Sequence, residues 1–437
     1  MAGSLRLHAC VLCACALVGR GLEASKRARA DRFDSFVRRH GRSYGPGSAE
    51  YQARQALFEA RLAGAELHNS QPGRRWTHDA WNAFADRTDE ELSALLGWRG
   101  PAAPPEAGLS LLARGQRQRR KDCELPEEWS WGGLNSSHRV RDQGTCGSCS
   151  ALAVALALEV HHEIYRGQTR TFSPQEFISC VQNPEACGGE GGCKGGFMEL
   201  HMSYAARHGC HQEHEYAHRS WIAGDAGQCT ALPKVDSGYV NTHPGVYQAP
   251  PAAPGSAFGM EGYERLPINR AEPLMRALVD RGPVVVALAA RPWFAYGGGI
   301  FDACSKGAEI DHAVVLLGFG KSAETPYWLI ANSWGSGWGE GGRIRLLRRS
   351  IEEEEAWCGM DRHPELGAAC SRNRDGSWKP KPLAPVEVCG TCSLLYNPVV
   401  PHFAGSSRAA TELAAARQRC GGDLQAVPTE TIALVSS

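Results

Sequence analysis

The chain of 437 residues is too long for one small domain and predicts two or three compact units. Lys plus Arg equals Asp plus Glu at 47 each, so no overall charge attracts the protein to nucleic acid or to an anionic membrane. The 17 cysteines are many for a cytosolic enzyme and favour folding in an oxidising compartment.

The first element in chain order is a secretory signal pattern over residues 1–24. A short start with one positive charge, Arg6, precedes the apolar run Leu7–Val18 and small residues up to Ala24. The alternatives are a membrane anchor and a buried helix, but the run is shorter than the roughly 20 apolar residues that a spanning helix needs. The pattern therefore predicts a signal peptide, entry into the secretory pathway and no membrane span.

The second segment, residues 25–121, divides into a charged helical part and a linker. Residues 32–96 have a helical pattern and few cysteines. Residues 100–121 are rich in Pro, Ala and Gly and end in a basic run at 117–121, which is typical of an exposed segment that proteases cut. The basic run is either a processing site or an ordinary solvated charge run.

Residues 122–370 are predicted to form the main folded domain, of the α+β class. A strongly apolar helix over Ala151–Tyr165 comes first. Strand-like runs follow at 284–289, 314–319, 327–331 and 342–347. Helix first and sheet second predicts two lobes that meet at a cleft, where functional sites tend to lie.

Two other segments lack clear periodicity. Residues 242–259 are rich in Pro, Ala and Gly and are predicted to form a surface loop. Residues 371–437 are predicted as a cysteine-containing C-terminal extension, whose role the sequence does not indicate.

The most informative stretch is Gln143–Ala153, in which glycines and Cys146 precede Cys149 and an apolar helix begins at once. A cysteine at a helix N-terminus lies at the positive end of the helix dipole, which stabilises a thiolate and makes the sulfur nucleophilic. A buried or disulfide-bonded cysteine fits this stretch equally well. The residues further along the chain decide between these interpretations.

Two later motifs supply the partners that a nucleophilic cysteine needs. His312 stands at the start of an apolar strand, and Asn332 precedes a turn rich in Gly and Trp. A histidine holds the thiolate as an ion pair and protonates the leaving amine, while a third group fixes the imidazole. Taken alone, His312 is more simply a strand-end histidine and Asn332 a turn former.

In chain order, the motifs Gln-x-x-Cys-Gly-Ser-Cys, Asp-His-Ala and Asn-Ser-Trp-Gly-x-x-Trp-Gly resemble those of the papain family of cysteine proteases. The resemblance covers roughly residues 30 to 365 and includes the glycine segment Gly192–Gly196. It implies a papain-like fold with a helical left lobe, a β-barrel-like right lobe and a cleft between them. It implies that Cys149 and His312 form a thiolate–imidazolium pair.

The resemblance also assigns roles to residues around that pair. Asn332 would orient His312, Trp334 would shield their contact, and Gln143 would complete the oxyanion hole. The backbone of Gly195 and Gly196 would pair with an extended substrate. A pocket for an apolar second residue on the acyl side, and the adjoining substrate surface, would include Phe197, Met198, Ile310, Asp311 and Ala313. Phe197 and Met198 are equally compatible with ordinary core positions.

The segment before the basic run resembles the family's inhibitory propeptide. Glu50, Arg54, Phe58 and Asn69 recur at the spacing of its helical motif, and residues 82–86 resemble its second motif. Glu50 and Arg54 are also a favourable i,i+4 pair. The pattern favours the cathepsin L-like branch and an intramolecular inhibitor.

The resemblance implies disulfides between Cys146 and Cys193, between Cys180 and Cys229, and between Cys304 and Cys358. Seven cysteines then remain, so at least one of them stays a thiol or pairs with another molecule. These are Cys123, Cys187, Cys210, Cys370, Cys389, Cys392 and Cys420. Cys389 and Cys392 also have the spacing of a redox or zinc motif, but ordinary disulfides are favoured in a secreted chain.

The function predicted from the sequence is that of a cysteine endopeptidase made as an inactive zymogen, acting through a thioester on Cys149. Protein or peptide substrates, a monomer, no metal or organic cofactor, and a lysosomal, vacuolar or extracellular location are expected. One departure favours an alternative: Ser150 stands where the family nearly always has tryptophan. The alternative is a papain fold retained as a catalytically impaired binding or regulatory protein.

Overall fold

The computed structural model describes residues 29–96, 125–230, 245–364, 370–373, 375–380 and 383–404. The predicted signal peptide and the basic run at 117–121 lie outside these ranges, as do Cys123 and Cys420.

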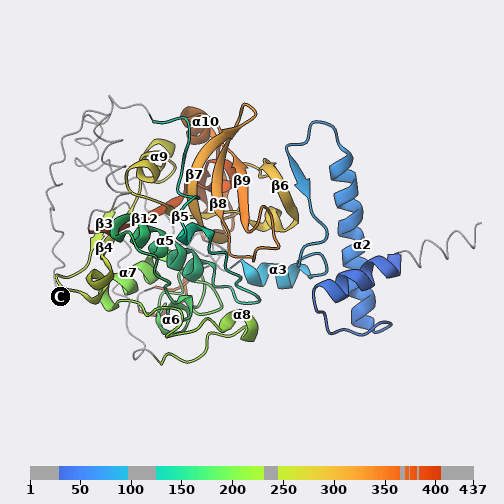
Figure 1. Ribbon diagram of the computed structural model, residues 1–437, viewed down its shortest axis with the longest axis horizontal. Coiled ribbons are helices and arrows are strands. Elements are labelled where there is room, and N and C mark those ends of the chain that lie inside the picture. Colours follow the sequence, from blue (N-terminus) through green and yellow to red (C-terminus); the bar gives the residue numbers. More distant parts are fainter. Residues whose placement is uncertain are drawn as a thin grey trace, which may run out of the picture.

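The helices form two groups, one before and one within the main domain (Figure 1). Residues 29–39 are helical and are followed by α2 (Ala49–Ser70) and α3 (Asp89–Leu95). The main domain contains α5 (Cys149–Arg166), α6 (Pro174–Cys180), α7 (Met198–His208), α8 (Ser220–Ala223), α9 (Ala271–Asp280), α10 (Ile351–Ala356) and the short 3-10 helices η1 (Ser136–His138), η2 (Pro254–Phe258), η3 (Arg291–Ala295) and η4 (Thr391–Ser393).

Helix α5 is the predicted apolar helix and begins at Cys149. Most of its residues are buried, as expected for a helix that is apolar on all sides. It ends at Gly167, whose left-handed φ of 69° closes the last turn without steric cost. It packs against α6, α7 and strand β7 (His312–Ser322). The nucleophile candidate therefore starts the central helix of the helical lobe.

The strands form one large sheet and a small hairpin. The large sheet follows the order β1-β6-β9-β8-β7-β5-β12-β4-β3, with β2 paired to β7. Its strands are β1 (Trp76–His78), β2 (Trp129–Ser130), β3 (Gly245–Gln248), β4 (Met260–Arg265), β5 (Val284–Leu288), β6 (Tyr296–Phe301), β7, β8 (Thr325–Ala331), β9 (Arg343–Leu347) and β12 (Asn397–Phe403). The hairpin pairs β10 (Cys358–Asp361) with β11 (Val386–Cys389).

The sheet is buried on both faces. Val285 of β5 and Val315 of β7 contribute to the apolar cluster that contains α5 and α7. Val286 and Leu316 alternate with them and contribute to the second cluster, which contains α9. This arrangement is the α+β architecture that the sequence predicts.

Two segments differ from their predicted structure. The surface loop predicted at 242–259 contains strand β3, which pairs with β4, and Tyr247 of this strand stacks on Tyr263 at 5.1 Å. The segment predicted as a C-terminal extension contributes β12, which lies between β5 and β4 and pairs antiparallel with both. Part of that extension is therefore an internal strand of the sheet.

Candidate active site

Cys149 lies at the first position of α5, immediately after the N-cap Ser148. Its side chain is a thiol and is buried. The loop before it is held against the segment that follows β8, because Gln143 N donates to Ser333 O at 2.9 Å. This contact brings the cysteine motif and the asparagine motif together across the two lobes.

The imidazole of His312 is fixed by Asn332. His312 opens β7 and Asn332 follows β8, so the antiparallel pairing of these strands places the two residues side by side. His312 Nε2 lies 2.8 Å from Asn332 Oδ1, and the same oxygen accepts a 2.8 Å bond from Ser333 N. An oxygen that accepts both bonds requires the proton on Nε2. Nδ1 is buried without a hydrogen-bond partner among the described residues and is the nitrogen left for chemistry.

Burial sets the protonation of this site. It lowers the pKa of His312 to about 4, against the opposing effect of the Asn332 hydrogen bond. The indole of Trp334 covers the imidazole, with ring centroids 5.0 Å apart. Burial of the closed site therefore disfavours the imidazolium predicted from the sequence, and exposure to water would favour it.

Gln143 is oriented by a second contact to Ser333. Ser333 Oγ donates to Gln143 Oε1 at 2.7 Å, which directs the amide NH₂ the other way. That NH₂ donates to the carbonyl of Cys146 at 3.0 Å and to the carbonyl of Leu95 at 2.7 Å. Leu95 ends helix α3 of the N-terminal segment, so this segment reaches the candidate oxyanion donor.

Aromatic contacts and a strand pairing fasten the same N-terminal segment to the β lobe. Phe84 packs edge-on against Phe294 at 5.1 Å and Trp334 at 5.3 Å. Asn82 Nδ2 donates to the carbonyl of Phe294 at 2.8 Å. Strand β1 pairs with β6 of the main domain, beside the helices drawn in blue (Figure 1). The N-terminal segment thus covers Trp334 and the candidate catalytic residues beneath it.

The predicted propeptide motif holds this segment together. Arg54 lies 3.4 Å from Glu50, as the sequence predicts, but its stronger partner is Glu91 of α3. Phe58 is fully buried in a small aromatic cluster, and Asn69 makes two 2.9 Å hydrogen bonds to the backbone of His78. Glu91 was not among the residues predicted for this motif, although Thr88-x-x-Glu91 has the spacing of a capping box, which the structure contains.

The predicted substrate-binding residues come together in the helical lobe and at the start of β7. Gly195 N donates to Gly147 O at 3.1 Å, and its φ of 86° favours glycine. Phe197, Met198, Ile310 and Ala313 belong with Cys149 to one buried apolar cluster. Asp311 Oδ1 accepts from Ala290 N at 2.7 Å, and burial raises the pKa of this carboxyl to about 7.

The disulfides correct one of the three predicted pairings. Cys146–Cys193 and Cys180–Cys229 are present. The predicted Cys304–Cys358 pairing is wrong, because Cys304 pairs with Cys392 and Cys358 with Cys389. The turn at η4 places Cys392 beside Cys304, while the β10–β11 hairpin places Cys358 opposite Cys389. A fifth bond joins Cys187 to Cys370.

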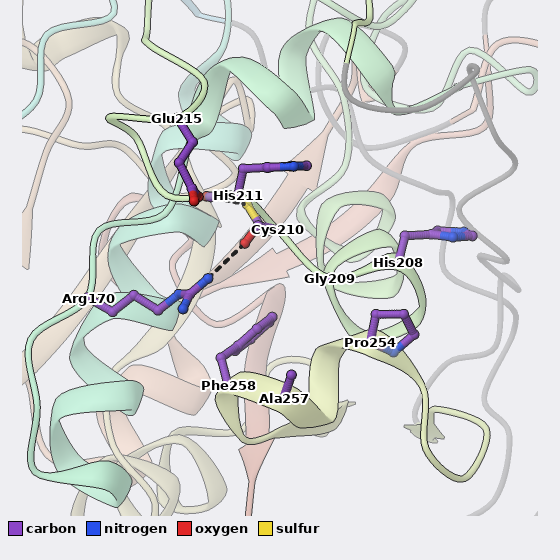
Figure 2. Close-up of a pocket in the computed structure, with 9 residues that line it drawn as sticks. All are labelled: Arg170, His208, Gly209, Cys210, His211, Glu215, Pro254, Ala257 and Phe258. Carbon is purple, nitrogen blue, oxygen red and sulfur yellow. Dashed lines mark hydrogen bonds between the residues drawn. The ribbon is translucent and has the colours of Figure 1, made fainter.

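Cys210 is the other thiol among the described residues, and its setting differs from that of Cys149. It lies just beyond the C-terminal end of α7 and lines a cavity of about 250 Å³, where Arg170 donates to its backbone carbonyl at 3.2 Å (Figure 2). Burial, reinforced by the nearby Glu176 carboxylate, raises the pKa of this thiol well above its usual value. Cys210 is therefore poorly suited to act as a nucleophile.

A cysteine at a helix start, a histidine fixed by an asparagine, and a covering N-terminal segment define the precursor of a cysteine protease. Residues 125–367 match the papain family of cysteine proteases, and residues 33–92 match the cathepsin propeptide inhibitor domain I29. The chain belongs to the papain family of cysteine proteases and carries an inhibitory propeptide.

Relatives and solved structures agree with this assignment. The chain is 29% identical to the probable cysteine protease RD21C of Arabidopsis thaliana, over 80% of this chain and 72% of that protein. It is 29% identical to a cathepsin L-like proteinase of Phaedon cochleariae, over 75% and 90% of the two chains. Its fold matches digestive procathepsin L 3 of Tenebrio molitor, with a TM-score of 0.60 and 24% identity over 86% and 99% of the two chains. It also matches the recombinant stem bromelain precursor, with a TM-score of 0.59 and 22% identity over the same shares.

Proposed function

We propose that Cys149 is the nucleophile of this protease and His312 its acid and base, with Asn332 as the residue that orients His312. The observation that carries this assignment is the contact of His312 Nε2 with Asn332 Oδ1, which leaves Nδ1 to exchange a proton with a thiol. Once the propeptide leaves, water reaches His312 and the pKa rises from its lowered value, which favours the charged pair.

The proposed reaction follows from these positions. The Cys149 sulfur attacks the peptide carbonyl carbon, and the carbonyl oxygen becomes negative. The side-chain NH₂ of Gln143 and the backbone N–H of Cys149 donate to that oxygen. His312 then gives its proton to the leaving amine, and a thioester remains on Cys149. Water activated by His312 hydrolyses the thioester and restores the thiol.

The proposed substrate is an extended peptide segment cut within the chain. Its backbone would pair with Gly195 and Gly196, and an apolar second residue would enter among Phe197, Met198 and Ala313. Their membership of one apolar cluster supports this preference. These three side chains are buried in an apolar cluster that includes no described residue of the N-terminal segment, so an apolar substrate residue would enter only if this cluster rearranges.

We also propose that the protein matures in the secretory pathway and works as a monomer in a lysosome, a vacuole or outside the cell. Five disulfides among the described residues require an oxidising compartment for folding, which supports this route. No helix in the described part of the chain is long and apolar enough to cross a membrane.

The test is to incubate the purified precursor in mild acid and to follow hydrolysis of fluorogenic peptides with apolar second residues. Cys149→Ala should abolish both hydrolysis and labelling by a thiol-reactive inhibitor. Cys210→Ala, which removes the other described thiol, should retain both. Cleavage by Cys149→Ala would overturn the assignment of the nucleophile. An activated wild-type protein that neither cleaves nor takes the label would favour the non-catalytic binding protein.

A further inference from the structure

A buried hydrogen bond joins Ser150, the residue after the proposed nucleophile, to His201 in the first turn of α7. Ser150 Oγ lies 3.1 Å from His201 Nε2, and the two residues are 1% and 6% exposed. The imidazole packs against the ring of Phe177 at 5.5 Å. Its other nitrogen, Nδ1, has no hydrogen-bond partner among the described residues. The bond to Ser150 is therefore the polar contact that fixes this imidazole.

The Ser150–His201 pair lies directly behind Gly196. A Cβ atom built on Gly196 would lie 3.6 Å from His201 Nε2 and 3.9 Å from Ser150 Oγ, which is van der Waals contact. Gly196 belongs to the proposed substrate-binding segment and precedes α7 by two residues. The pair therefore lies about one side-chain atom beyond the backbone that substrate is proposed to contact, with no side chain between them.

Other links among the described residues join the same two segments. The Cys146–Cys193 disulfide ties the loop before the nucleophile to the glycine segment. Gly147 and Lys194 form a bridge just beyond it. Gly195 N also donates to Gly147 O at 3.1 Å, so these links hold the glycine segment as far as the residue before Gly196. The Ser150–His201 bond adds a side-chain contact beyond them, between the first turn of α7 and the first turn of the helix that carries Cys149.

The pair is uncharged over the range in which the protease is proposed to work. Burial lowers the pKa of His201 to about 3, so the imidazole stays neutral in mild acid. A neutral imidazole and a hydroxyl each offer one donor and one acceptor, so the bond persists through activation.

We infer that Ser150 and His201 are positioning residues that hold Gly196 at a set distance from Cys149, so that a bound peptide presents its carbonyl to the sulfur. This inference rests on the proposed function. Backbone contacts to Gly196 exist in both the bound substrate and the transition state, so their loss raises KM more than it lowers kcat. A substrate with only one residue on the acyl side does not reach Gly196, so its KM should not change when Ser150 or His201 is replaced.

The test compares the activated variants His201→Leu, which removes the hydrogen bond, His201→Gln, which retains a donor and an acceptor, and Ser150→Ala. His201→Leu and Ser150→Ala should raise KM for a peptide with several acyl-side residues by about fivefold to tenfold. Their kcat should stay within about twofold of wild type, because the chemistry at Cys149 is untouched. His201→Gln should recover most of the loss.

His161→Leu is the matched control. His161 is also fully buried, makes one hydrogen bond to Pro283 O at 2.9 Å, and has an unpartnered Nδ1 within the described structure. It should lower the melting temperature without changing KM. The inference is overturned if His201→Leu and Ser150→Ala lower the melting temperature as the control does and leave KM unchanged. Ser150→Ala removes one oxygen atom and carries the test if His201→Leu does not fold. A wild-type protein that fails to cleave, or a Cys149→Ala variant that cleaves, contradicts the proposed function instead.

Discussion

The side-chain NH₂ of Gln143 donates a 2.7 Å hydrogen bond to the backbone carbonyl of Leu95. A carbonyl of the propeptide thus occupies the donor that is proposed to stabilise the oxyanion of a substrate. The propeptide thus places a backbone carbonyl where a substrate would place its own. The Leu95 carbonyl is held there by the tertiary contacts of the propeptide.

Replacement of Gln143 tests this shared donor. Gln143→Ala should lower kcat of the activated enzyme on the order of a hundredfold, because one oxyanion donor is lost. KM should change little, since the oxygen becomes negative only in the transition state. Steady-state kinetics on one fluorogenic peptide measures both constants. An unchanged kcat would exclude Gln143 from the oxyanion site.

Phe84 should govern how firmly the precursor is inhibited. Phe84→Ala removes the edge contacts to Phe294 and Trp334, and each such contact contributes about 0.5–1.5 kcal/mol beyond the buried area. The uncleaved precursor should therefore hydrolyse peptides on the order of tenfold faster than wild-type precursor. Leu67→Ala is the control, because Leu67 lies on the propeptide surface with 67% of its area exposed. Equal rates of peptide hydrolysis by the two uncleaved variant precursors would show that Phe84 does not anchor the inhibitor.

The pair of Arg54 and Glu91 should make propeptide stability depend on acid. The Arg54 guanidinium lowers the pKa of Glu91 from 4.5 to about 2. A carboxyl with a lowered pKa contributes stability that is present above pH 4.5 and is lost as the pH falls from 4.5 toward 2. The melting temperature of the propeptide, measured in the Cys149→Ala precursor, should fall across this window.

Glu91→Gln supplies the comparison for that pH dependence. It should lower the melting temperature at neutral pH and flatten its dependence below pH 4.5, because the titrating carboxyl is gone. Glu50→Gln should have little effect, since Glu50 is largely exposed and 3.4 Å from Arg54. Parallel curves for wild type and Glu91→Gln would exclude Glu91 as the acid-sensitive group.

Two disulfides replace the predicted Cys304–Cys358 pairing, and loss of each should lower the free energy of unfolding by a different amount. Removal of a native disulfide typically costs about 2–5 kcal/mol, and more for a longer loop. The Cys304–Cys392 bond closes a separation of 88 residues and Cys358–Cys389 one of 31. The double serine variant at 304 and 392 should therefore have the lower free energy of unfolding, measured with urea. Peptide mapping without reduction should recover these pairs, and a 304–358 peptide would contradict the structure.

The sequence predicts the local elements well, because helix α5 and strands β5, β7, β8 and β9 each carry their own pattern. It fails at β12, whose Pro398 and Pro401 argue against an internal strand. The register explains how both are accommodated: β5 pairs only as far as Val399, and β4 pairs only from Val399 onward. Each proline lies where only one neighbouring strand is paired.

The candidate site was predictable for a similar reason and only to a similar extent. Cys149, His312 and Asn332 stand in short sequence motifs, and their roles were predicted from these motifs. The contacts of the Leu95 carbonyl with Gln143 and of His201 with Ser150 form only when distant segments come together in the fold. No local sequence pattern indicates them. The partners of Cys304 and Cys358 depend in the same way on where η4 and the β10–β11 hairpin lie.

The position of β12 also sets the order in which a newly made chain becomes an enzyme. The sheet lacks the strand between β5 and β4 until residue 403 has left the ribosome, whereas the propeptide core around Phe33, Phe36 and Phe58 is complete more than 300 residues earlier. Segments made first can fold first during synthesis. The inhibitor segment is therefore made before the protease it restrains, and the large sheet is completed only near the end of synthesis.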